Sequence, residues 1–289
     1  RNIKRIKFVH LSVRKLKSQM EKMRIIIRRI AVWCRNLCLL AFLSSLLAVV
    51  VYRFVPVYFT PLMGIRLYEQ WQADKPLKLA HTWVPLSQIS HHLPQAVVAS
   101  EDNLFMDHHG FDMEQIQQAR SEAEKGGRVR GASTISQQTA KNVFLWPGKS
   151  YLRKGLEAYF TLLIEWIWGK ERIMEVYLNS IEMGEGIYGA QAVAQAHFKK
   201  EAYLLERSEA ALIAATLPNP RRFNSANPSP YMKKRQAKIL SLMDKLLQLP
   251  MGYGADEMKS STKGKDKKRK KWRADLVITT WDASLMPMR

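Results

Sequence analysis

A run of seventeen residues without a charged side chain, residues 36–52, is the most apolar segment in the pattern of polar and apolar positions along the chain. As a helix rising about 1.5 Å per residue it spans roughly 25 Å, slightly less than the ~30 Å hydrocarbon core of a bilayer. Arg35 and Arg53 flank the run, and their long side chains can extend to the interface. We therefore predict a transmembrane helix over residues 36–55. A cleaved signal peptide and a buried core helix are the alternatives.

We predict a mainly α-helical fold for the rest of the chain. Residues 56–84 contain short apolar runs between prolines and are predicted to be a linker. From residue 85 to about 250, apolar residues recur at helical spacing, and we predict one domain there. Its helices are expected at residues 96–99 after Pro94, from Asp112 to Gly126-Gly127, from Ser150 to Gly169, and at 171–178, 209–217 and 231–247. No strand of any length is expected.

Charge is concentrated at the two ends of the chain. Of the formal net charge of +21, residues 1–35 (12 Lys and Arg, one acid) and residues 259–273 (nine Lys and Arg, one acid) supply +19. The nearly neutral middle excludes a uniformly basic nucleic-acid-binding domain. The basic residues before the apolar run predict a cytoplasmic N-terminus and an outer location for the domain. Residues 251–289 are predicted to be a disordered basic tail.

The first group of candidate catalytic residues is the segment 101–110, which begins with Glu101 and Asp102. A carboxylate at the C-terminal end of a short buried helix meets the negative end of the helix dipole, which favours its protonated form. Such a group is a candidate general base if its pKa moves toward neutrality. The alternative is an ordinary solvated helix end.

Three further groups follow along the chain. Uncharged polar side chains crowd residues 133–138, before Lys141; they could bind a sugar or phosphate, or begin a helix with Ser133 as N-cap. Arg153 and Glu157 share a helix face, with Lys154 beside them. A carboxylate among cations could hold a diphosphate, or the group could be a surface ion pair of little energetic value. In residues 172–190 we favour structural roles, with Glu175 bonding backbone and the glycines forming a tight turn.

Taken in order, these groups resemble the glycosyltransferase domain of peptidoglycan polymerases, found in class A penicillin-binding proteins and in monofunctional biosynthetic peptidoglycan transglycosylases. The resemblance covers about residues 85–245, and a fifth group, residues 210–220, resembles the closing helix and proline turn of the family. No transpeptidase domain fits in the remainder, so the monofunctional type is implied. The matching motifs are E-D-x-x-F-x-x-H-x-G (Glu101, Asp102, Phe105, His108, Gly110), G-x-S-T-I-S-Q-Q (131–138), R-K-x-x-E (153–157) and I-x-E-x-Y-L-N (173–179).

The resemblance implies a lysozyme-like, two-lobed glycosyltransferase domain behind a single N-terminal transmembrane helix. It implies polymerisation of lipid II with inversion and release of undecaprenyl diphosphate. Glu101 would be the general base and Glu157 the second catalytic residue. It implies no organic cofactor and allows a Mg²⁺ or Mn²⁺ ion, for which we assign no ligands. The implied substrate-binding residues are Ser133, Thr134, Gln138, Lys141, Arg153 and Lys154, and the supporting residues are Asp102, Phe105, His108, Gly110, Glu175 and Asn179.

The implied partners are lipid II, the nascent glycan strand, the membrane, and other cell-wall synthesis or division proteins, with no nucleic acid. The implied location is the bacterial inner membrane, crossed once, with the catalytic domain outside the cytoplasm. Phe144-Leu145-Trp146 is a candidate apolar contact with the membrane or, equally, part of the core. Two other functions stay open: a lytic enzyme that cuts glycan strands with the same two acids, and a membrane-tethered scaffold whose basic ends bind anionic lipid or nucleic acid. A lytic enzyme would not need three cations grouped for a diphosphate.

Overall fold

The computed structural model describes residues 2–124 and 133–246, and the chain forms two compact units, Arg1–Tyr52 and Arg53–Arg289. The first unit consists of most of helix α1 (Asn2–Phe54). Within the described residues, one helical segment, Met20–Phe54, is long and apolar enough to cross a membrane, with a mean hydropathy of 2.2 in its most apolar window. The apolar run at residues 36–52 lies inside this segment.

The stretch predicted to be a linker contains regular structure. Helix α2 (Pro61–Gln72) begins with the Thr60 hydroxyl accepting a hydrogen bond from the Met63 amide at 3.3 Å. Pro61 occupies the first helical position, where the missing N–H costs no hydrogen bond. A short strand, β1 (Ala80–His81), and a 3₁₀ turn (Leu86–Gln88) follow. Pro61, one of the prolines that suggested a linker, is therefore the first residue of a helix.

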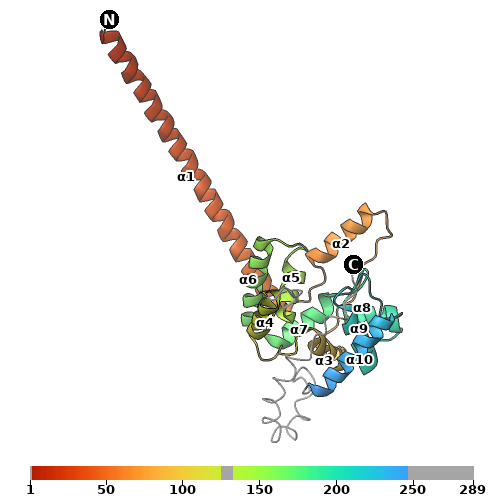
Figure 1. Cartoon of the computed structure of the whole chain (residues 1–289). Coiled ribbons are helices and arrows are strands. Elements are labelled where there is room, and N and C mark those ends of the chain that lie inside the picture. The colour runs from red at the N-terminus through yellow and green to blue at the C-terminus, as the bar shows by residue number, and fades with distance from the viewer. Residues whose placement is uncertain (1, 125–132, 247–289) are drawn as a thin grey trace. The chain divides into compact units, whose positions relative to one another are not determined.

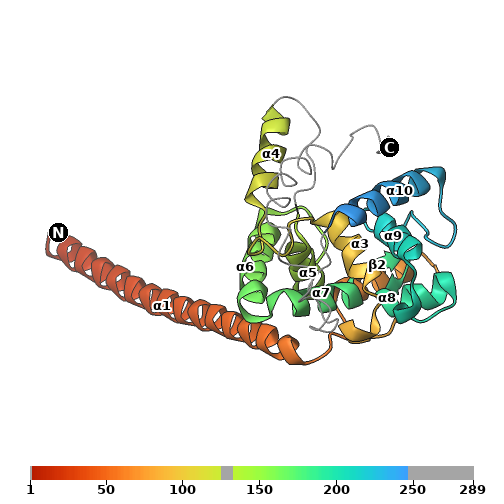
Figure 2. The same ribbon diagram turned by 90° about the horizontal axis from the view of Figure 1, so that it is seen from below.

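Two groups of helices build the second unit. In the first, α5 (Ile135–Phe144) packs on α6 (Tyr151–Ile167) and α7 (Gly169–Ser180). In the second, α3 (His92–Glu101) packs on α9 (Arg207–Thr216) and α10 (Pro230–Lys245). Figure 2 shows α5 and α6 on one side, α9 and α10 on the other, and α3 between them. The prediction of a mainly α fold is confirmed.

A three-stranded sheet lies beside these helices, although no strand was expected from the sequence. Strand β3 (Ile187–Tyr188) pairs in parallel with β1 and antiparallel with β2 (Glu182–Gly184). Each strand has two or three residues, which is too short to leave an alternating pattern in the sequence. Helix α8 (Ala190–Val193), a π turn (Ala194–Phe198) and a 3₁₀ turn (Ala202–Leu204) complete this region.

Several predicted helix ends agree with the structure and others shift. Asp112 caps α4 (Met113–Glu124), and Ser150 caps α6. Helix α3 begins two residues before Pro94, and Gly126-Gly127 lies outside the described residues. Leu145 is buried and Phe144 stacks on Phe160 at a centroid distance of 4.5 Å, whereas Trp146 is partly exposed. The structure therefore favours the core interpretation for the first two residues of 144–146.

Two glycines provide a matched test of the local backbone. Gly189 has a φ of +83°, and a Cβ there would lie 2.5 Å from the carbonyl oxygen of Asn179. We expect Gly189→Ala to lower the free energy of unfolding by more than about 1 kcal/mol. Gly155, inside α6, has open space around it, so Gly155→Ala should stabilise by about 0.5–1 kcal/mol. Thermal unfolding of both variants checks this, and equal melting temperatures would contradict it.

Candidate active site

Glu101 is the last residue of α3, and its carboxylate lies where three helices meet. Its Oε1 accepts hydrogen bonds from the hydroxyl of Ser100 at 3.0 Å and from Nη2 of Arg235 on α10 at 3.4 Å. Its Oε2 accepts one from Nε2 of Gln138 on α5 at 3.2 Å. The side chain is 14% exposed. The carboxylate is thus fixed by its neighbours but keeps access to solvent.

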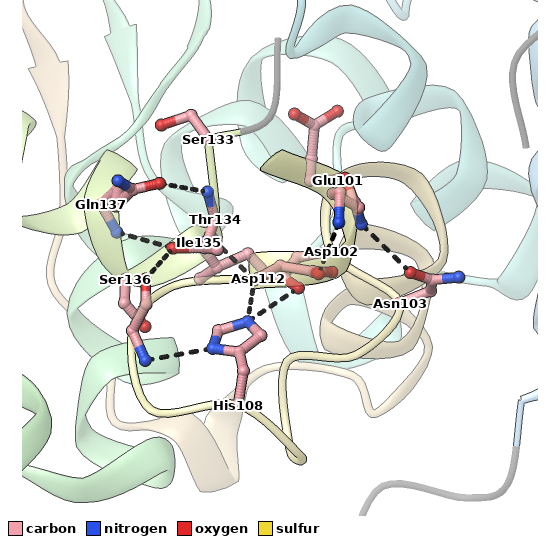
Figure 3. A network of polar contacts seen from close by, with 12 residues as sticks. Glu101, Asp102, Asn103, His108, Asp112, Ser133, Thr134, Ile135, Ser136 and Gln137 are labelled. Carbon is pink, nitrogen blue, oxygen red and sulfur yellow. Dashed lines mark hydrogen bonds and ion pairs between the residues drawn. The ribbon is translucent and has the colours of Figure 1, made fainter. Parts of the chain in front are cut away.

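Asp102 has a different role from that of its neighbour. It is buried, and its Oδ2 accepts bonds from Nε2 of His108 and from the backbone amide of Ile135, both at 2.9 Å. The Gly110 amide donates to Nδ1 of His108 at 3.1 Å, so Nε2 is the nitrogen that carries the proton. Figure 3 shows Asp102 pointing toward His108 while Glu101 points away from both. The Asp102–His108 pair therefore connects the segment 101–110 to the start of α5.

The start of α5 is capped by Thr134 and not by Ser133, the residue that the helix-start alternative had named. The Thr134 hydroxyl accepts from the Gln137 amide at 3.2 Å, and the Gln137 side chain accepts from the Thr134 amide at 3.0 Å. The same hydroxyl donates to the Gly110 carbonyl at 2.7 Å. These bonds give the Thr134 hydroxyl a structural task, and the predicted contact of this residue with substrate stays a prediction. Ser133 lies just before the cap, half-buried.

Gln138 connects the carboxylate of Glu101 to Tyr177 of α7. The Tyr177 hydroxyl donates to Oε1 of Gln138 at 3.2 Å. Burial, together with the negative charges of Glu101 and Asp102, holds the pKa of Tyr177 well above its ordinary value of 10. Tyr177 therefore remains a donor at neutral pH, and it orients the Gln138 amide so that the nitrogen faces Glu101.

The second cluster lies on α6 and includes a buried carboxylate, Glu157, whose side chain is 3% exposed. Arg153 donates from Nη1 to Glu157 at 2.6 Å and from Nε to the Gly148 carbonyl at 2.7 Å. Lys154 forms a second ion pair with Glu157. Arg153 is itself nearly buried, so this is not the surface ion pair that the sequence left open.

Lys141 of α5 links the two clusters. Burial lowers the pKa of its ammonium group, Glu157 and Glu101 oppose this shift, and Arg153 and Lys154 add to it. A single ammonium group therefore interacts electrostatically with both carboxylates. These predicted site residues come from three helices, α3, α5 and α6.

The remaining supporting residues stabilise the surroundings of the site. Phe105 is buried, with Nζ of Lys170 4.6 Å from its ring centre. Gly110 has a φ of +90°, and a Cβ there would lie 2.8 Å from a methyl group of Thr161. Glu175 accepts a hydrogen bond from the Leu86 amide at 3.3 Å. The Asn179 side chain accepts one from the Val84 amide and donates one to the Val84 carbonyl. The predicted structural roles of Glu175 agree with these contacts.

Sequence reasoning missed Arg235 at this site and gave Tyr177 no role. Arg235 follows two other basic residues, Lys233 and Lys234, in α10. Nothing local marks it, because only the packing of α10 on α3 places it against Glu101. Tyr177 belongs to the motif at residues 173–179, and its place in that motif was the sequence feature that could have indicated a role at the site.

The residues at the cationic cluster do not fit a divalent metal. Its carboxylate, Glu157, is already paired with both Arg153 and Lys154. In the described part of the chain, no group of three or more His, Cys, Asp or Glu side chains is arranged to hold a metal ion. The mechanism below therefore uses the side chains alone.

A partly exposed carboxylate, together with cations held by a buried glutamate, in a helical domain that follows an apolar helix in the sequence, suits a glycosyltransferase that acts on a phosphate-linked sugar. Residues 71–244 match the family model described as Transglycosylase, and the chain belongs to this family. This confirms the resemblance seen in the motifs.

Curated relatives extend the comparison beyond the domain. The chain is 58% identical over 243 residues to a biosynthetic peptidoglycan transglycosylase of Bacteroides thetaiotaomicron, covering 84% of this chain and 98% of the relative. It is 52% identical to the protein of the same name from Caulobacter vibrioides, covering 71% and 89%. The corresponding protein of Pseudomonas syringae pv. syringae is 51% identical, covering 70% and 86%.

Proposed function

We propose that the protein is a membrane-anchored peptidoglycan glycosyltransferase that polymerises lipid II into β-1,4-linked glycan strands, with inversion and release of undecaprenyl diphosphate. The observation that carries this is the match of residues 71–244 to the transglycosylase family, and the charges of Glu101 and Glu157 both act on the ammonium group of Lys141. A candidate base and a candidate diphosphate site therefore belong to one centre.

In the proposed reaction, Glu101 takes the proton of the 4-hydroxyl group of the incoming lipid II. A sugar hydroxyl is too weak an acid to attack unaided at neutral pH, so an aligned base is required. The oxygen attacks the anomeric carbon of the growing strand, and the bond from that carbon to the diphosphate oxygen breaks. The bonding electrons leave with the diphosphate, and the proton stays on Glu101. Gln138, oriented by Tyr177, holds the carboxylate in place.

The cationic cluster would stabilise the leaving group. Negative charge develops on the diphosphate as the bond breaks, and preorganised cations lower the energy of that state. Lys141, Arg153 and Lys154 are the candidate cations, and Glu157 holds the last two in position. Ser133 and Thr134 remain candidate substrate contacts, and Thr134 also has a positioning role through its cap.

The apolar helix supports a location at the membrane. We propose that α1 anchors the chain in the bacterial inner membrane, crosses it once, and leaves the N-terminus in the cytoplasm because of the Lys and Arg residues before the apolar run. The prenyl chain of lipid II stays in the bilayer because each buried CH₂ is worth about 0.8 kcal/mol. A tethered enzyme therefore meets its substrate at the membrane surface.

A direct assay separates the proposed function from its nearest alternative. The purified full-length protein is incubated with lipid II and, separately, with finished glycan strands. Growth of polymer from lipid II supports a polymerase. Shortening of finished strands, without polymer formation from lipid II, would show a lytic enzyme instead.

The lowered pKa of Lys141 predicts a limit at alkaline pH. Since only the protonated ammonium neutralises a diphosphate, kcat/KM should fall as pH rises, with a midpoint below 10.5, the ordinary value for lysine. Lys141→Arg, whose guanidinium stays charged, should move this limb to higher pH, and Lys141→Gln should give low kcat/KM throughout. The pH dependence of initial rates measures this. An alkaline limb at the same pH in the arginine variant would contradict the assignment.

A further inference from the structure

Two arginines connect residues 53–55, which directly follow the apolar run, to the junction between α6 and α7. Arg53, the first residue of the second unit, donates from Nη1 to the carbonyl of Ile167, the last residue of α6. Arg172, in the first turn of α7, donates from Nη2 to the carbonyl of Val55 at 2.6 Å. Each side of the contact therefore gives a guanidinium to a backbone carbonyl of the other. We call these two bonds the clasp.

Both bonds of the clasp have a charged donor. The last carbonyls of a helix lack partners within it and carry partial negative charge, so the end of α6 is a favourable place for the guanidinium of Arg53. Hydrogen bonds from a charged donor are also roughly twice as strong as neutral ones. The clasp is therefore a specific attachment of the chain that leaves the apolar helix.

Further contacts hold Arg172 in place for its bond to Val55. Its Nη1 donates to Glu175 at 2.8 Å, and its guanidinium lies 5.1 Å from the ring centre of Trp83. The Arg172 side chain is 14% exposed. The planar guanidinium makes these contacts together because its donors point in fixed directions. Arg172 is thus preorganised to bind the Val55 carbonyl.

The clasp lies on one face of α7, and the active site lies beyond the other. Arg172, Glu175 and Asn179 are three and four residues apart, so they share a face of the helix. The last two bind the backbone of residues 84–86. Tyr177, which orients the amide beside the candidate base, is on the opposite face by its spacing. The same helix therefore contacts the chain leaving the apolar helix and the active site.

The clasp removes slack between the apolar helix and the rest of the second unit. Without it, residues 53–60 could extend by up to roughly 25 Å, at ~3.3 Å per residue. That length is close to the thickness of the hydrocarbon core. The diphosphate of a prenyl-linked substrate stays at the bilayer surface, so a loosely tethered active site would spend much of its time away from it.

We propose that Arg172 is a positioning residue that fixes the distance of the active site from the bilayer surface and thereby favours substrate carried by a membrane-embedded prenyl chain. This inference rests on the proposed function. Arg172 acts through the Val55 carbonyl and does not touch the substrate. The apparent affinity for membrane-embedded lipid II then depends on the fraction of molecules whose active site stands at the diphosphate.

The test compares a substrate in a membrane with one in solution. The full-length protein is reconstituted in vesicles and given either lipid II in the same bilayer or a short-chain, water-soluble lipid II analogue. Arg172→Gln should raise the KM for membrane-embedded lipid II about fivefold, because about a fifth of the molecules then hold the site at the right distance. The kcat and KM for the soluble analogue should stay close to the wild-type values. Arg172→Lys, which keeps a charged donor, should give an intermediate KM.

An insertion separates positioning from folding. Gly-Ser-Gly-Ser placed between Tyr52 and Arg53 lengthens the tether and leaves the clasp intact. It should reproduce the rise in KM for membrane-embedded lipid II. Adding Arg172→Gln to it should raise this KM little further, because both changes remove the same constraint. If Arg172 only stabilised the fold, the two effects would multiply, and kcat for the soluble analogue would fall as well.

Arg221→Gln is the matched control, since Arg221 is 46% exposed and pairs with Glu69 on the surface of the same unit. It should leave the kinetic constants for both substrates unchanged. An unchanged KM for membrane-embedded lipid II in Arg172→Gln, or an equal rise in KM for both substrates, would overturn the inference. Failure of the wild type to polymerise lipid II in vesicles would contradict the proposed function itself, which is a separate outcome.

Discussion

We expect Glu101→Gln to abolish the proposed polymerisation of lipid II, with a loss in rate of about 10³-fold or more, at the upper end of what a general base contributes. Glutamine has nearly the same size and can still accept hydrogen bonds from Arg235 and Ser100. It cannot take a proton from the attacking hydroxyl at neutral pH. The measurement is the initial rate of polymer formation at saturating lipid II, where a chemical defect appears in kcat.

A control distinguishes lost chemistry from lost structure. Glu185, in the turn between β2 and β3, is half-exposed and lies 3.5 Å from Lys75 in a surface ion pair. Such pairs contribute little to stability, so Glu185→Gln should keep wild-type activity and melting temperature. Glu101→Gln should also melt normally. Substantial polymer formation by a folded Glu101→Gln protein would show that another group is the base.

Glu157→Gln has the second large effect, and it acts on activity and stability together. Removing the carboxylate breaks the ion pairs of Glu157 with Lys154 and Arg153. Arg153, which is nearly buried, then keeps its hydrogen bond to the Gly148 carbonyl. Loss of one partner from a buried ion pair costs about 3 kcal/mol. The two cations also lose the group that positions them, so we expect a loss in kcat/KM of about 10²-fold. Chemical denaturation and initial rates measure the two effects.

An exposed ion pair provides the comparison. Arg207 and Asp244 pair between α9 and α10, and the Asp244 side chain is 65% exposed. Asp244→Asn should cost less than about 1 kcal/mol and leave the rate unchanged. Equal destabilisation by Glu157→Gln and Asp244→Asn would show that the burial of Glu157 has no energetic consequence.

The helices were predictable because their signals are local. Ser150 and Asp112 cap helices where the sequence placed them, and the apolar spacing of α6 marks its length. The cap of α5 was misplaced by one residue, because Ser133 and Thr134 are both good caps and only the bonds to Gln137 and Gly110 select Thr134. The strands were missed because each has only two or three residues, and because β1 is held by pairing with β3, about a hundred positions away.

The candidate site was predictable in composition and only partly in geometry. The motif regions named Glu101, Lys141, Arg153 and Glu157, and in the structure Arg153 pairs with Glu157 while the charges of Glu101 and Glu157 both act on Lys141. The sequence gave no sign that Asp102 would turn away from Glu101 to bind His108 and the start of α5. It gave no sign that Arg235 would contact Glu101, since that contact joins residues 134 positions apart.

By itself the sequence determined the apolar N-terminal helix, the mainly helical character of the domain and the chemical groups available, because these depend on the order and spacing of neighbouring residues. Only the tertiary structure decided which carboxylate faces the cations, and which amide and guanidinium hold it. Those relations arise when α3, α5, α6, α7 and α10 pack together, and burial then sets the charge states and hydrogen bonds that no single segment contains.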